Sequence, residues 1–509
     1  MRNSVLCYLE ETAEKFPDKL AISDGTLDVT FAEWRQRALC LAEAISSKIQ
    51  GRHLPILVYL PKGTNTLISF AGILYSGNYY TPTDVKFPFQ KVESVLKCLQ
   101  PALIISDEKN AVKLLENGIR RERILLLEEV DFSKQNIDSE FFLKHIIDTD
   151  LAYVFFTSGS TGVPKGVAIK QKSIIDYIDW AAEEFSIDEN VCIANQAPFY
   201  FDNSILDIYL CMSRGATLYI PPEMYYAFQA KLLAFLEEKK ITFIFWVPSA
   251  LVGAANSGLL DRFDLSAIRK VLFCGEVMPN RHLNIWRKVL PDAEFANLYG
   301  PTEITDACSF FRVNREFADD DPLPIGNACR NTEIMLLDDQ NRLVTEQDVM
   351  GELCVRGTSI SVGYYGNPEK TEAVFVQNPL NPYYEEKIYR TGDLAHYNEF
   401  GEIMFDGRKD FQIKHMGYRI ELGEIETAIL AMEEIDNACC LYDDRQQKIV
   451  SVYQSDKGMD GLEIKKRLMS VLPKYMIPTE YFAVKEMPYN DNGKINRKQL
   501  KEELIEANK

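Results

Sequence analysis

Tyr153-Val154-Phe155-Phe156 is followed directly by Thr157-Ser158-Gly159-Ser160-Thr161-Gly162-Val163-Pro164-Lys165-Gly166. The four apolar residues predict a buried strand, and the glycines, hydroxyl side chains and lysine after them are typical of a phosphate-binding loop. Glycines let backbone N–H groups turn toward an anion, hydroxyls add donors without bulk, and a lysine adds positive charge. The spacing differs from the Walker pattern G-x-x-x-x-G-K-[ST]. The alternative is a polar loop that only connects two strands.

Short apolar stretches alternate with helical stretches on both sides of this loop. Residues 4–48 predict a helix, a strand and a second helix, which begins at Thr30 with a capping box to Glu33. The further predicted strands are 56–60, 103–106, 123–127, 153–156, 193–196, 217–220, 242–246 and 270–273, and the further predicted helices are 65–75, 172–184, 203–212 and 227–239. This alternation predicts an α/β fold with mostly parallel sheets flanked by helices.

The pattern of the chain changes near residue 325. Segments such as 333–337, 351–355 and 403–405 are separated by turn residues, as in a small antiparallel barrel or curved sheet. We therefore predict a large domain, 1–409, made of α/β sheets over 1–324 and a β-rich subdomain over 325–409. Residues 410–509, which alternate strand and helix, predict a small α+β domain.

Composition excludes several classes of protein. Hydrophobic residues make up 46% and charged residues 26%, which is typical of a soluble globular protein. The net charge of -19 argues against nucleic acid as a partner, although it leaves room for a local ATP site. The 11 cysteines show no C-x-x-C spacing, which favours reduced thiols in the cytoplasm. We expect neither a signal peptide nor a membrane span, because no apolar run approaches about 18 residues.

Four later stretches carry glycines and polar residues in a characteristic order. They are Asn297-Leu298-Tyr299-Gly300-Pro301-Thr302-Glu303; Tyr389-Arg390-Thr391-Gly392-Asp393; Gly407-Arg408-Lys409-Asp410 with the run 417–426; and Asn492-Gly493-Lys494-Ile495. Together with the phosphate loop they resemble the motifs of the acyl-adenylate-forming family over essentially the whole chain. That family includes nonribosomal peptide synthetase adenylation domains, D-alanine:D-alanyl carrier protein ligases, acyl-CoA synthetases and luciferases.

The resemblance implies a reaction in two halves that uses ATP and Mg²⁺. A carboxylate attacks the α-phosphate of ATP to give an acyl adenylate and pyrophosphate, and a thiol then takes the acyl group. The protein has to position the reactants and neutralise the negative charge that grows at phosphorus in the transition state.

The resemblance also assigns residues to the nucleotide. The β- and γ-phosphates would be held by Thr157, Ser158, Gly159, Ser160, Thr161, Gly162 and Lys165. Asn297, Leu298 and Tyr299 would form the adenine site, with Tyr299 stacked on the base. Thr302 would contact the α-phosphate and Glu303 would hold Mg²⁺, a cation that prefers oxygen ligands. Asp393 would accept both ribose hydroxyls and Arg408 would add a ribose contact. Without the resemblance, Tyr299 is a core residue and Glu303 an acid at a helix start.

Lys494 is the residue expected to be catalytic together with Thr302 and Glu303. It follows a turn-rich run, so a loop would present its ammonium group to the substrate carboxylate and the ribose. Composition alone indicates a surface lysine. By resemblance, the small domain turns about a hinge at Asp410 after adenylation, and the run 417–426 then serves the thiol step.

Asp202 decides between classes of acid. It follows a predicted strand and opens a predicted helix, and in the amino-acid branch of the family an aspartate at this position pairs with the α-ammonium group. The alternative is an ordinary helix N-cap. The matching pocket positions are Asp202, Asn203, Leu206, Phe245, Leu272, Cys274, Leu298, Asp306, Ala307 and Lys494.

Two pocket positions bear on the substrate, and a third position, Gln171, departs from the family pattern. Cys274 matches a cysteine in the pocket of the D-alanine ligases. Asp306 departs from their pattern, because an apolar residue is expected at its position. A carboxylate in the pocket needs a partner, which favours a polar or cationic amino acid. Gln171 departs from the histidine of many relatives.

The acceptor is expected to be the phosphopantetheine thiol of a separate carrier protein, because the sequence shows no carrier serine motif. The leading hypothesis is an amino-acid-activating ligase that loads this carrier. The alternatives are a D-alanine-specific ligase, a CoA ligase for a plain carboxylic acid, and a non-catalytic protein that has kept the fold. The first two retain a use for Asp202, which the CoA ligase lacks, and Lys165, Glu303, Asp393 and Lys494 argue against the last.

Overall fold

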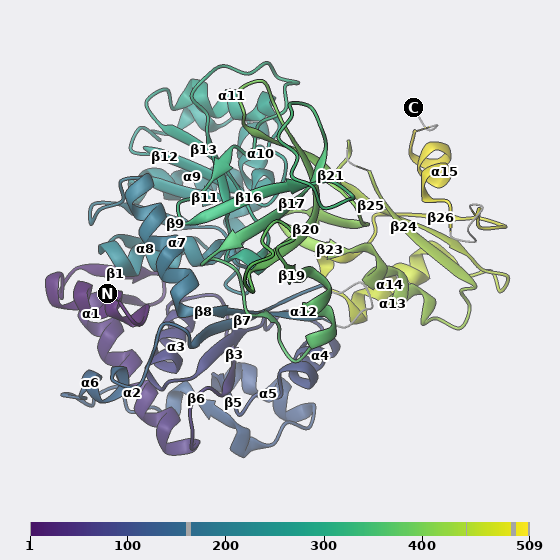
Figure 1. Cartoon of the computed structure of the whole chain (residues 1–509). Coiled ribbons are helices and arrows are strands. Elements are labelled where there is room, and N and C mark those ends of the chain that lie inside the picture. The colour runs from purple at the N-terminus through teal and green to yellow at the C-terminus, as the bar shows by residue number, and fades with distance from the viewer. Residues whose placement is uncertain (1, 159–163, 444, 490–494, 507–509) are drawn as a thin grey trace. The chain divides into compact units, whose positions relative to one another are not determined.

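A computed structural model describes residues 2–158, 164–443, 445–489 and 495–506 (Figure 1). The chain divides into two compact units. The first comprises Met1–Val85, Leu99–Phe155 and Gly166–Lys409, and the second comprises Lys86–Cys98, Phe156–Lys165 and Asp410–Lys509. The short segment at the phosphate loop therefore groups with the C-terminal residues.

In the described residues of the first unit, a nine-stranded sheet has the order β15-β14-β13-β12-β11-β9-β10-β1-β2. Neighbours from β13 to β1 run parallel, and β14, β15 and β2 add antiparallel edges. The strands are β1 Leu20–Ser23, β2 Asp28–Thr30, β9 Cys192–Asn195, β10 Thr217–Tyr219, β11 Phe243–Trp246, β12 Lys270–Cys274, β13 Glu294–Tyr299, β14 Ser309–Arg312 and β15 Asn327–Ala328.

A second large sheet has seven strands in the described chain, in the order β18-β8-β7-β4-β3-β5-β6. Strands β3 to β7 pair in parallel, and β18 pairs antiparallel with β8. The strands are β3 Pro55–Tyr59, β4 Tyr79–Pro82, β5 Leu103–Ser106, β6 Ile124–Leu126, β7 Leu151–Thr157, β8 Lys165–Lys170 and β18 Gly363–Tyr364.

The third sheet is curled and wholly antiparallel. In the described residues its order is β16-β17-β20-β19, with β21 paired to β20. The strands are β16 Thr332–Leu337, β17 Gly351–Gly357, β19 Phe375–Gln377, β20 Lys387–Tyr397 and β21 Ile403–Arg408. The segment 325–409 also supplies β15 and β18 to the two large sheets.

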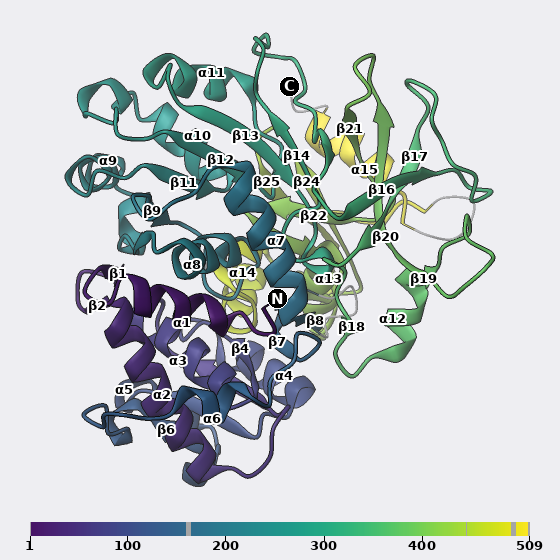
Figure 2. The same cartoon turned by 60° about the vertical axis from the view of Figure 1, so that its left-hand side comes forward.

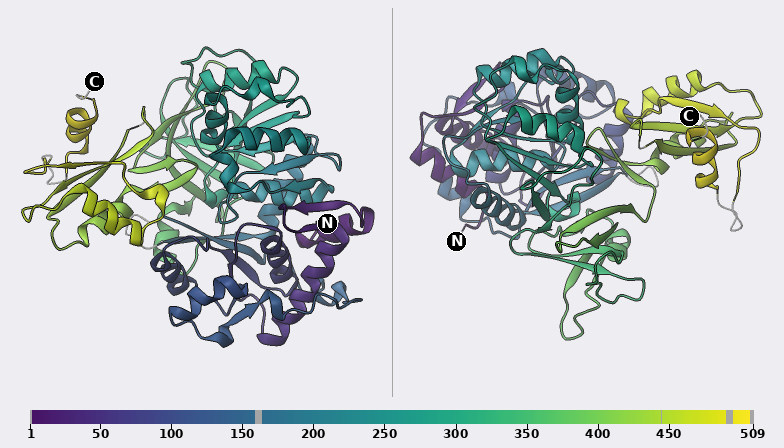
Figure 3. Two further views of the ribbon diagram at one scale, coloured as in Figure 1. Left: turned by 180° about the vertical axis from the view of Figure 1, so that it is seen from behind. Right: turned by 90° about the horizontal axis from the view of Figure 1, so that it is seen from above.

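Helices cover the two large sheets. The helices of this unit are α1 Leu6–Lys15, α2 Phe31–Lys48, α3 Thr64–Tyr75, α5 Glu108–Glu116, α6 Ser139–Leu143, α7 Gln171–Glu184, α8 Asn203–Arg214, α9 Gln229–Glu238, α10 Pro248–Asn256, α11 Asn280–Val289 and α12 Pro368–Val374. Figure 2 shows α7 and α8 between the strands of the two large sheets, and one hydrophobic core joins them to both. The teal helices α9, α10 and α11 pack on the opposite face of the nine-stranded sheet around Trp246 and Trp286 (Figure 3).

The second unit has its own core. Strands β22 Gln412–His415 and β23 Tyr418–Glu421 form a hairpin, and β24 Asn437–Asp443, β25 Lys448–Gln454 and β26 Glu480–Ala483 form a three-stranded sheet. Alternate side chains of β24 enter different cores, since Cys440 packs with Ile464 and Leu468, whereas Cys439 packs with Leu500. The helices are α4 Phe89–Leu99, α13 Leu422–Leu430, α14 Gly461–Val471 and α15 Arg497–Lys501.

The α/β fold class predicted from the sequence is confirmed, and so is the cap of α2. Thr30 Oγ1 accepts a hydrogen bond from the Glu33 N–H at 3.2 Å, and Glu33 bonds back to the Thr30 N–H at 2.8 Å. The single strand predicted within residues 4–48 was wrong, because the chain forms the hairpin β1–β2 there. Asp24 accepts bonds from the next residues, and Gly25 takes φ +79°, which reverses the chain.

Two further observations concern the whole chain. No helix in the described ranges has both the length and the apolar character needed to cross a bilayer. All 11 cysteines are free thiols in the described structure.

Candidate active site

Four predicted pocket residues share one face of the nine-stranded sheet. Phe245 of β11 lies opposite Leu272 of β12, and Cys274 of β12 lies opposite Leu298 of β13. All four are at most 2% exposed and belong to the core that contains α7 and α8. The period of two along a strand places the residues between them on the other face, against α9, α10 and α11. The sheet thus forms an apolar wall at these positions.

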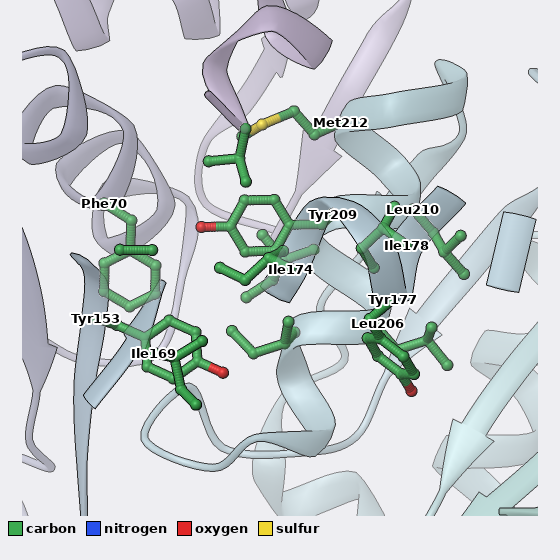
Figure 4. Close-up of a cluster of buried hydrophobic side chains, with 14 of the residues drawn as sticks. Phe70, Tyr153, Ile169, Ile174, Tyr177, Ile178, Leu206, Tyr209, Leu210 and Met212 are labelled. Carbon is green, nitrogen blue, oxygen red and sulfur yellow. The ribbon is translucent and has the colours of Figure 1, made fainter. Parts of the chain in front are cut away.

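Helix α8 contributes to the same side. Asp202 precedes the helix and its Oδ1 accepts a hydrogen bond from the Asn203 N–H at 3.0 Å, and the residue is 9% exposed. Leu206, one turn later, is fully buried and belongs to the hydrophobic cluster drawn in Figure 4, as Tyr177 does. An aspartate at the start of a helix is favoured electrostatically, so its position as an N-cap does not by itself require a ligand.

Asp306 is also buried in the first unit. The residue is 1% exposed, and the Tyr177 hydroxyl donates a hydrogen bond to its Oδ2 at 2.7 Å. Thr305 and Asp306 take left-handed φ angles of 58° and 76°, an uncommon conformation outside glycine. Burial raises the pKa of Tyr177 well above its ordinary value and the Asp306 carboxylate adds to this, so the tyrosine is a neutral donor.

Tyr153 lies at this place too, although the sequence indicated only a buried strand residue. It is 0% exposed, and its hydroxyl has no hydrogen-bond partner in the described residues. Burial raises its pKa most, and the charges of Asp202 and then of Tyr209 and Asp306 raise it further. Two carboxylates therefore lie within electrostatic reach of one buried hydroxyl, which comes from β7 (Figure 4).

Three of the predicted nucleotide residues, Tyr299, Asp393 and Arg408, form a hydrogen-bonded group. The Tyr299 hydroxyl donates to Asp393 Oδ2, and Arg408 Nη1 lies 2.6 Å from Asp393 Oδ1. Asp393 is 3% exposed, so both partners hold a buried carboxylate. Asn297 donates from Nδ2 to the Pro324 carbonyl at 2.8 Å. The register of β20 and β21, which pairs Asp393 with Arg408, explains their contact.

Thr302 and Glu303 lie in a short 3-10 turn, Thr302–Ile304, directly after β13. Glu303 is fully buried, and the Tyr364 hydroxyl donates to its Oε1 at 2.7 Å. The described residues contain no group of three metal-ligating side chains. A single carboxylate suits Mg²⁺ that arrives with a nucleotide, because Mg²⁺ takes one or two carboxylates together with phosphate and water oxygens.

The remaining predicted residues belong to the second unit. Gly159, Ser160, Thr161, Gly162 and Lys494 lie outside the described residues. Thr157 ends β7, and its Oγ1 is 3.5 Å from the Lys165 carbonyl oxygen. The Asp410 carboxylate accepts a hydrogen bond from the Gln412 N–H at 3.2 Å.

Gln171 has a local structural role in the first unit. Its Oε1 accepts hydrogen bonds from Ser4 Oγ at 2.6 Å and from the Val5 N–H at 3.1 Å. The residue is 2% exposed and ties the start of α1 to the start of α7. Sequence reasoning missed this role and the contacts of Tyr177 and Tyr364, because each contact joins residues far apart in the chain. It missed Tyr153 because an apolar pattern predicts burial and not which charged groups lie nearby.

Comparison with known proteins identifies the class. The sequence profile described as AMP-binding enzyme matches residues 9–365. The chain is 31% identical to a D-alanine–D-alanyl carrier protein ligase of Listeria innocua, over 99% of this chain and 100% of that one. It therefore belongs to the AMP-binding, acyl-adenylate-forming family and is an adenylate-forming ligase.

Two further similarities concern one more relative in sequence and one solved structure. Zwittermicin A synthase ZmaJ of Bacillus cereus is 29% identical over 98% of this chain and 95% of that one. The Vibrio cholerae adenylation domain AlmE, solved with glycyl-adenosine-5'-phosphate, matches with a TM-score of 0.85 at 21% identity, covering 99% of this chain and 98% of that one. The second likeness shows that the fold is that of an adenylation domain.

Proposed function

We propose that the protein activates an amino acid with ATP and Mg²⁺, giving an aminoacyl adenylate and pyrophosphate, and then transfers the aminoacyl group to the phosphopantetheine thiol of a separate carrier protein. The observation that carries this is a buried apolar wall, Phe245, Leu272, Cys274 and Leu298, in the same core as Leu206 and with Asp202 at the start of α8. An ammonium group matches a carboxylate there, whereas a plain fatty acid brings no positive charge that Asp202 could bind. The likeness to carrier protein ligases supports the thiol acceptor.

The proposed nucleotide roles are those that the family resemblance assigns, and the groups already described support them. Asp393, fixed by Tyr299 and Arg408, accepts the ribose hydroxyls, and the aromatic ring of Tyr299 faces the base. Thr302 contacts the α-phosphate, and Glu303 holds Mg²⁺, which neutralises phosphate charge. Ser158 and Lys165 serve the β- and γ-phosphates, and Lys494 bridges the substrate carboxylate and the nucleotide. Asp410 is the hinge between the proposed domains 1–409 and 410–509.

The side chain of the substrate is polar or cationic in this proposal. Asp306 is a second buried carboxylate near the pocket wall. The buried Tyr153 hydroxyl, whose pKa is raised by the charges of both Asp202 and Asp306, supplies one more polar group. A site with buried polar groups discriminates strongly against a ligand that leaves them unpaired. Asn203 and Ala307 complete the proposed lining.

D-alanine is the second candidate. It is favoured by the 31% identity to a D-alanine–D-alanyl carrier protein ligase and by Cys274 in the wall. A methyl side chain would leave Asp306 with only protein partners such as Tyr177. The two candidates differ in whether Asp306 contacts the substrate.

ATP–pyrophosphate exchange, measured with each amino acid in both configurations, tests the proposal. Exchange with one polar or cationic amino acid supports it, and exchange with D-alanine alone supports the second candidate. Exchange only with fatty or aryl acids contradicts both. A carrier protein with its phosphopantetheine arm should then become aminoacylated, whereas transfer to free CoA alone would indicate a CoA ligase.

Asp202→Ala should weaken binding of the amino acid and leave binding of ATP unchanged. We expect the KM for the amino acid to rise at least about 10-fold, because one charge-assisted hydrogen bond is lost, while the KM for ATP stays unchanged. Asp107→Ala is the matched control, since Asp107 also caps a helix, accepting from the Asn110 N–H at 2.7 Å. Equal amino-acid KM values in the two variants would remove the assigned role of Asp202.

A further inference from the structure

Both described ends of the phosphate loop contact strand β23 of the second unit. The Ser158 hydroxyl donates to the Arg419 carbonyl at 2.7 Å and accepts from the Glu421 N–H at 3.1 Å. Lys165 Nζ lies 3.0 Å from Glu421 Oε1. Two residues proposed to hold phosphate are thus bonded to one short strand of the same chain.

These contacts are buried and supported. Ser158 and Glu421 are each 7% exposed, and the side chain of Lys165 is 13% exposed. Gln412 donates from Nε2 to Glu421 Oε1 at 2.6 Å, which fixes the carboxylate that faces Lys165. A buried ion pair held by further hydrogen bonds is costly to break from one side. The contact between Lys165 and Glu421 is therefore a buried, hydrogen-bonded ion pair and not an exposed surface contact.

The Glu421 carboxylate and the Arg419 carbonyl on β23 offer what a phosphate offers to these donors, namely hydrogen-bond acceptors and negative charge. A carboxylate and a carbonyl oxygen both accept hydrogen bonds, and the carboxylate carries the negative charge that a lysine binds. A serine hydroxyl has a single proton to donate. While Ser158 donates to Arg419 it cannot donate to a phosphate oxygen, so the strand and a phosphate compete for the same donor.

We propose that Glu421 and the Arg419 carbonyl take the place of pyrophosphate on Ser158 and Lys165. The strand β23 occupies these donors once pyrophosphate has left, and pyrophosphate or ATP displaces the strand when it binds. This rests on the phosphate role of the loop in the proposed function and extends it. Because the strand lies in the run 417–426 assigned to the thiol step, the exchange makes that step follow pyrophosphate release. Glu421 is a positioning residue that acts through Lys165.

Binding of magnesium pyrophosphate to the full-length protein, measured by calorimetry, tests the competition. Glu421→Gln removes the competing charge, so pyrophosphate should bind about 5- to 10-fold more tightly if the strand occupies the donors for most of the time. Lys165→Gln should weaken binding. Glu434→Gln is the matched control, because it removes another paired carboxylate of this unit, 2.9 Å from Arg467, and should bind as the unaltered protein does.

The outcomes separate the inference from the proposed function. Binding by the unaltered protein with no tightening in Glu421→Gln would overturn the inference alone. If neither the unaltered protein nor Glu421→Gln binds pyrophosphate, the phosphate role of the loop fails and the inference fails with it. General damage to the fold would weaken binding, so a gain in affinity cannot come from misfolding.

Hydrogen exchange gives a second readout on the unaltered protein. The Glu421 N–H is held by Ser158 Oγ, so saturating pyrophosphate should speed exchange in the peptide that covers β22 and β23. Exchange in β24 and β25 should stay unchanged, because those strands lie in a separate sheet. An unchanged rate for β22 and β23 at saturation would overturn the proposal.

Discussion

Asp207 on α8 is a buried carboxyl group that the proposed chemistry does not use. It is 0% exposed and accepts a hydrogen bond from Asn195 Nδ2 at 2.8 Å. Burial raises its pKa to about 8, against the smaller opposing effects of Asn195 and then Lys62. The folded protein therefore holds a proton at neutral pH that the unfolded chain has lost. A raised carboxyl pKa lowers the stability of the fold as pH rises from about 4 to about 8.

Asp207→Asn should remove this pH dependence, because an amide has nearly the shape of the protonated acid and carries no proton to lose. The advantage of the variant should grow by up to about 1.4 kcal/mol for each pH unit within this window. Thermal midpoints measured at pH 5 and pH 7 check it. A midpoint difference between variant and unaltered protein that is the same at both pH values would contradict the raised pKa.

Tyr177 positions Asp306, and the pair can be tested without removing the carboxylate. Tyr177→Phe deletes the hydrogen bond at 2.7 Å. The KM for the amino acid should rise about 10-fold, because a hydrogen bond to a charged group contributes about 1.5–3 kcal/mol. The KM for ATP should stay unchanged.

Tyr209→Phe is the control for Tyr177→Phe. It removes the hydroxyl of an equally buried tyrosine, which lies 3.1 Å from the Tyr80 hydroxyl. Pyrophosphate exchange at varied amino-acid concentration compares the two. If both variants shift the amino-acid KM alike, Tyr177 has no special link to the substrate.

At the scale of elements, the turn after β13 decides where Thr302, Glu303 and Asp306 lie. Gly300 has no room for a side chain, since a Cβ there would lie 2.2 Å from the Asp306 carbonyl oxygen and 2.7 Å from the Ala307 Cα. Both obstacles are backbone atoms, which cannot move aside as a side-chain tip can. Close packing of the turn on itself therefore requires glycine at this position.

Gly300→Ala should displace the turn and lower pyrophosphate exchange by at least about 10-fold, because a misplacement of about 1 Å near reacting groups costs about 100-fold. The thermal midpoint should also fall. Gly253→Ala in α10 is the control, because its Cβ would meet only the Gln229 side chain at 3.4 Å and alanine favours a helix by up to about 1 kcal/mol. Retained exchange in Gly300→Ala would show that the turn tolerates the shift.

At the scale of the whole molecule, we propose that the two halves of the reaction use different parts of the chain. In the proposed function Lys494 serves only adenylation, and the run 417–426 serves the thiol step. Lys494→Ala should therefore abolish adenylate formation and leave transfer from a supplied aminoacyl adenylate largely intact. Single-turnover assays of each half measure this. Equal loss of both halves would count against separate arrangements for the two steps.

The sequence predicted much of the fold because the signals were local. Each strand and helix predicted by range between residues 56 and 273 was found within a few residues, and Thr30 and Glu33 gave the start of α2. The hairpin β1–β2 was missed because a short turn interrupts what the apolar pattern shows as one strand. Elements that were not predicted include strands β4 and β13 and helices α4, α5, α10 and α11. The motifs indicated the family, which the match over residues 9–365 confirms.

What the sequence alone determined is the order of the motifs, the alternation of strands and helices, and hence the class of chemistry. These features depend on residues close together in the sequence and on the spacing of apolar residues along it. The tertiary structure decided which groups meet: Tyr177 with Asp306, 129 residues apart, Tyr299 with Asp393, 94 apart, and Lys165 with Glu421, 256 apart. Such partners depend on sheet register, side-chain direction and burial, which appear only once distant elements pack together.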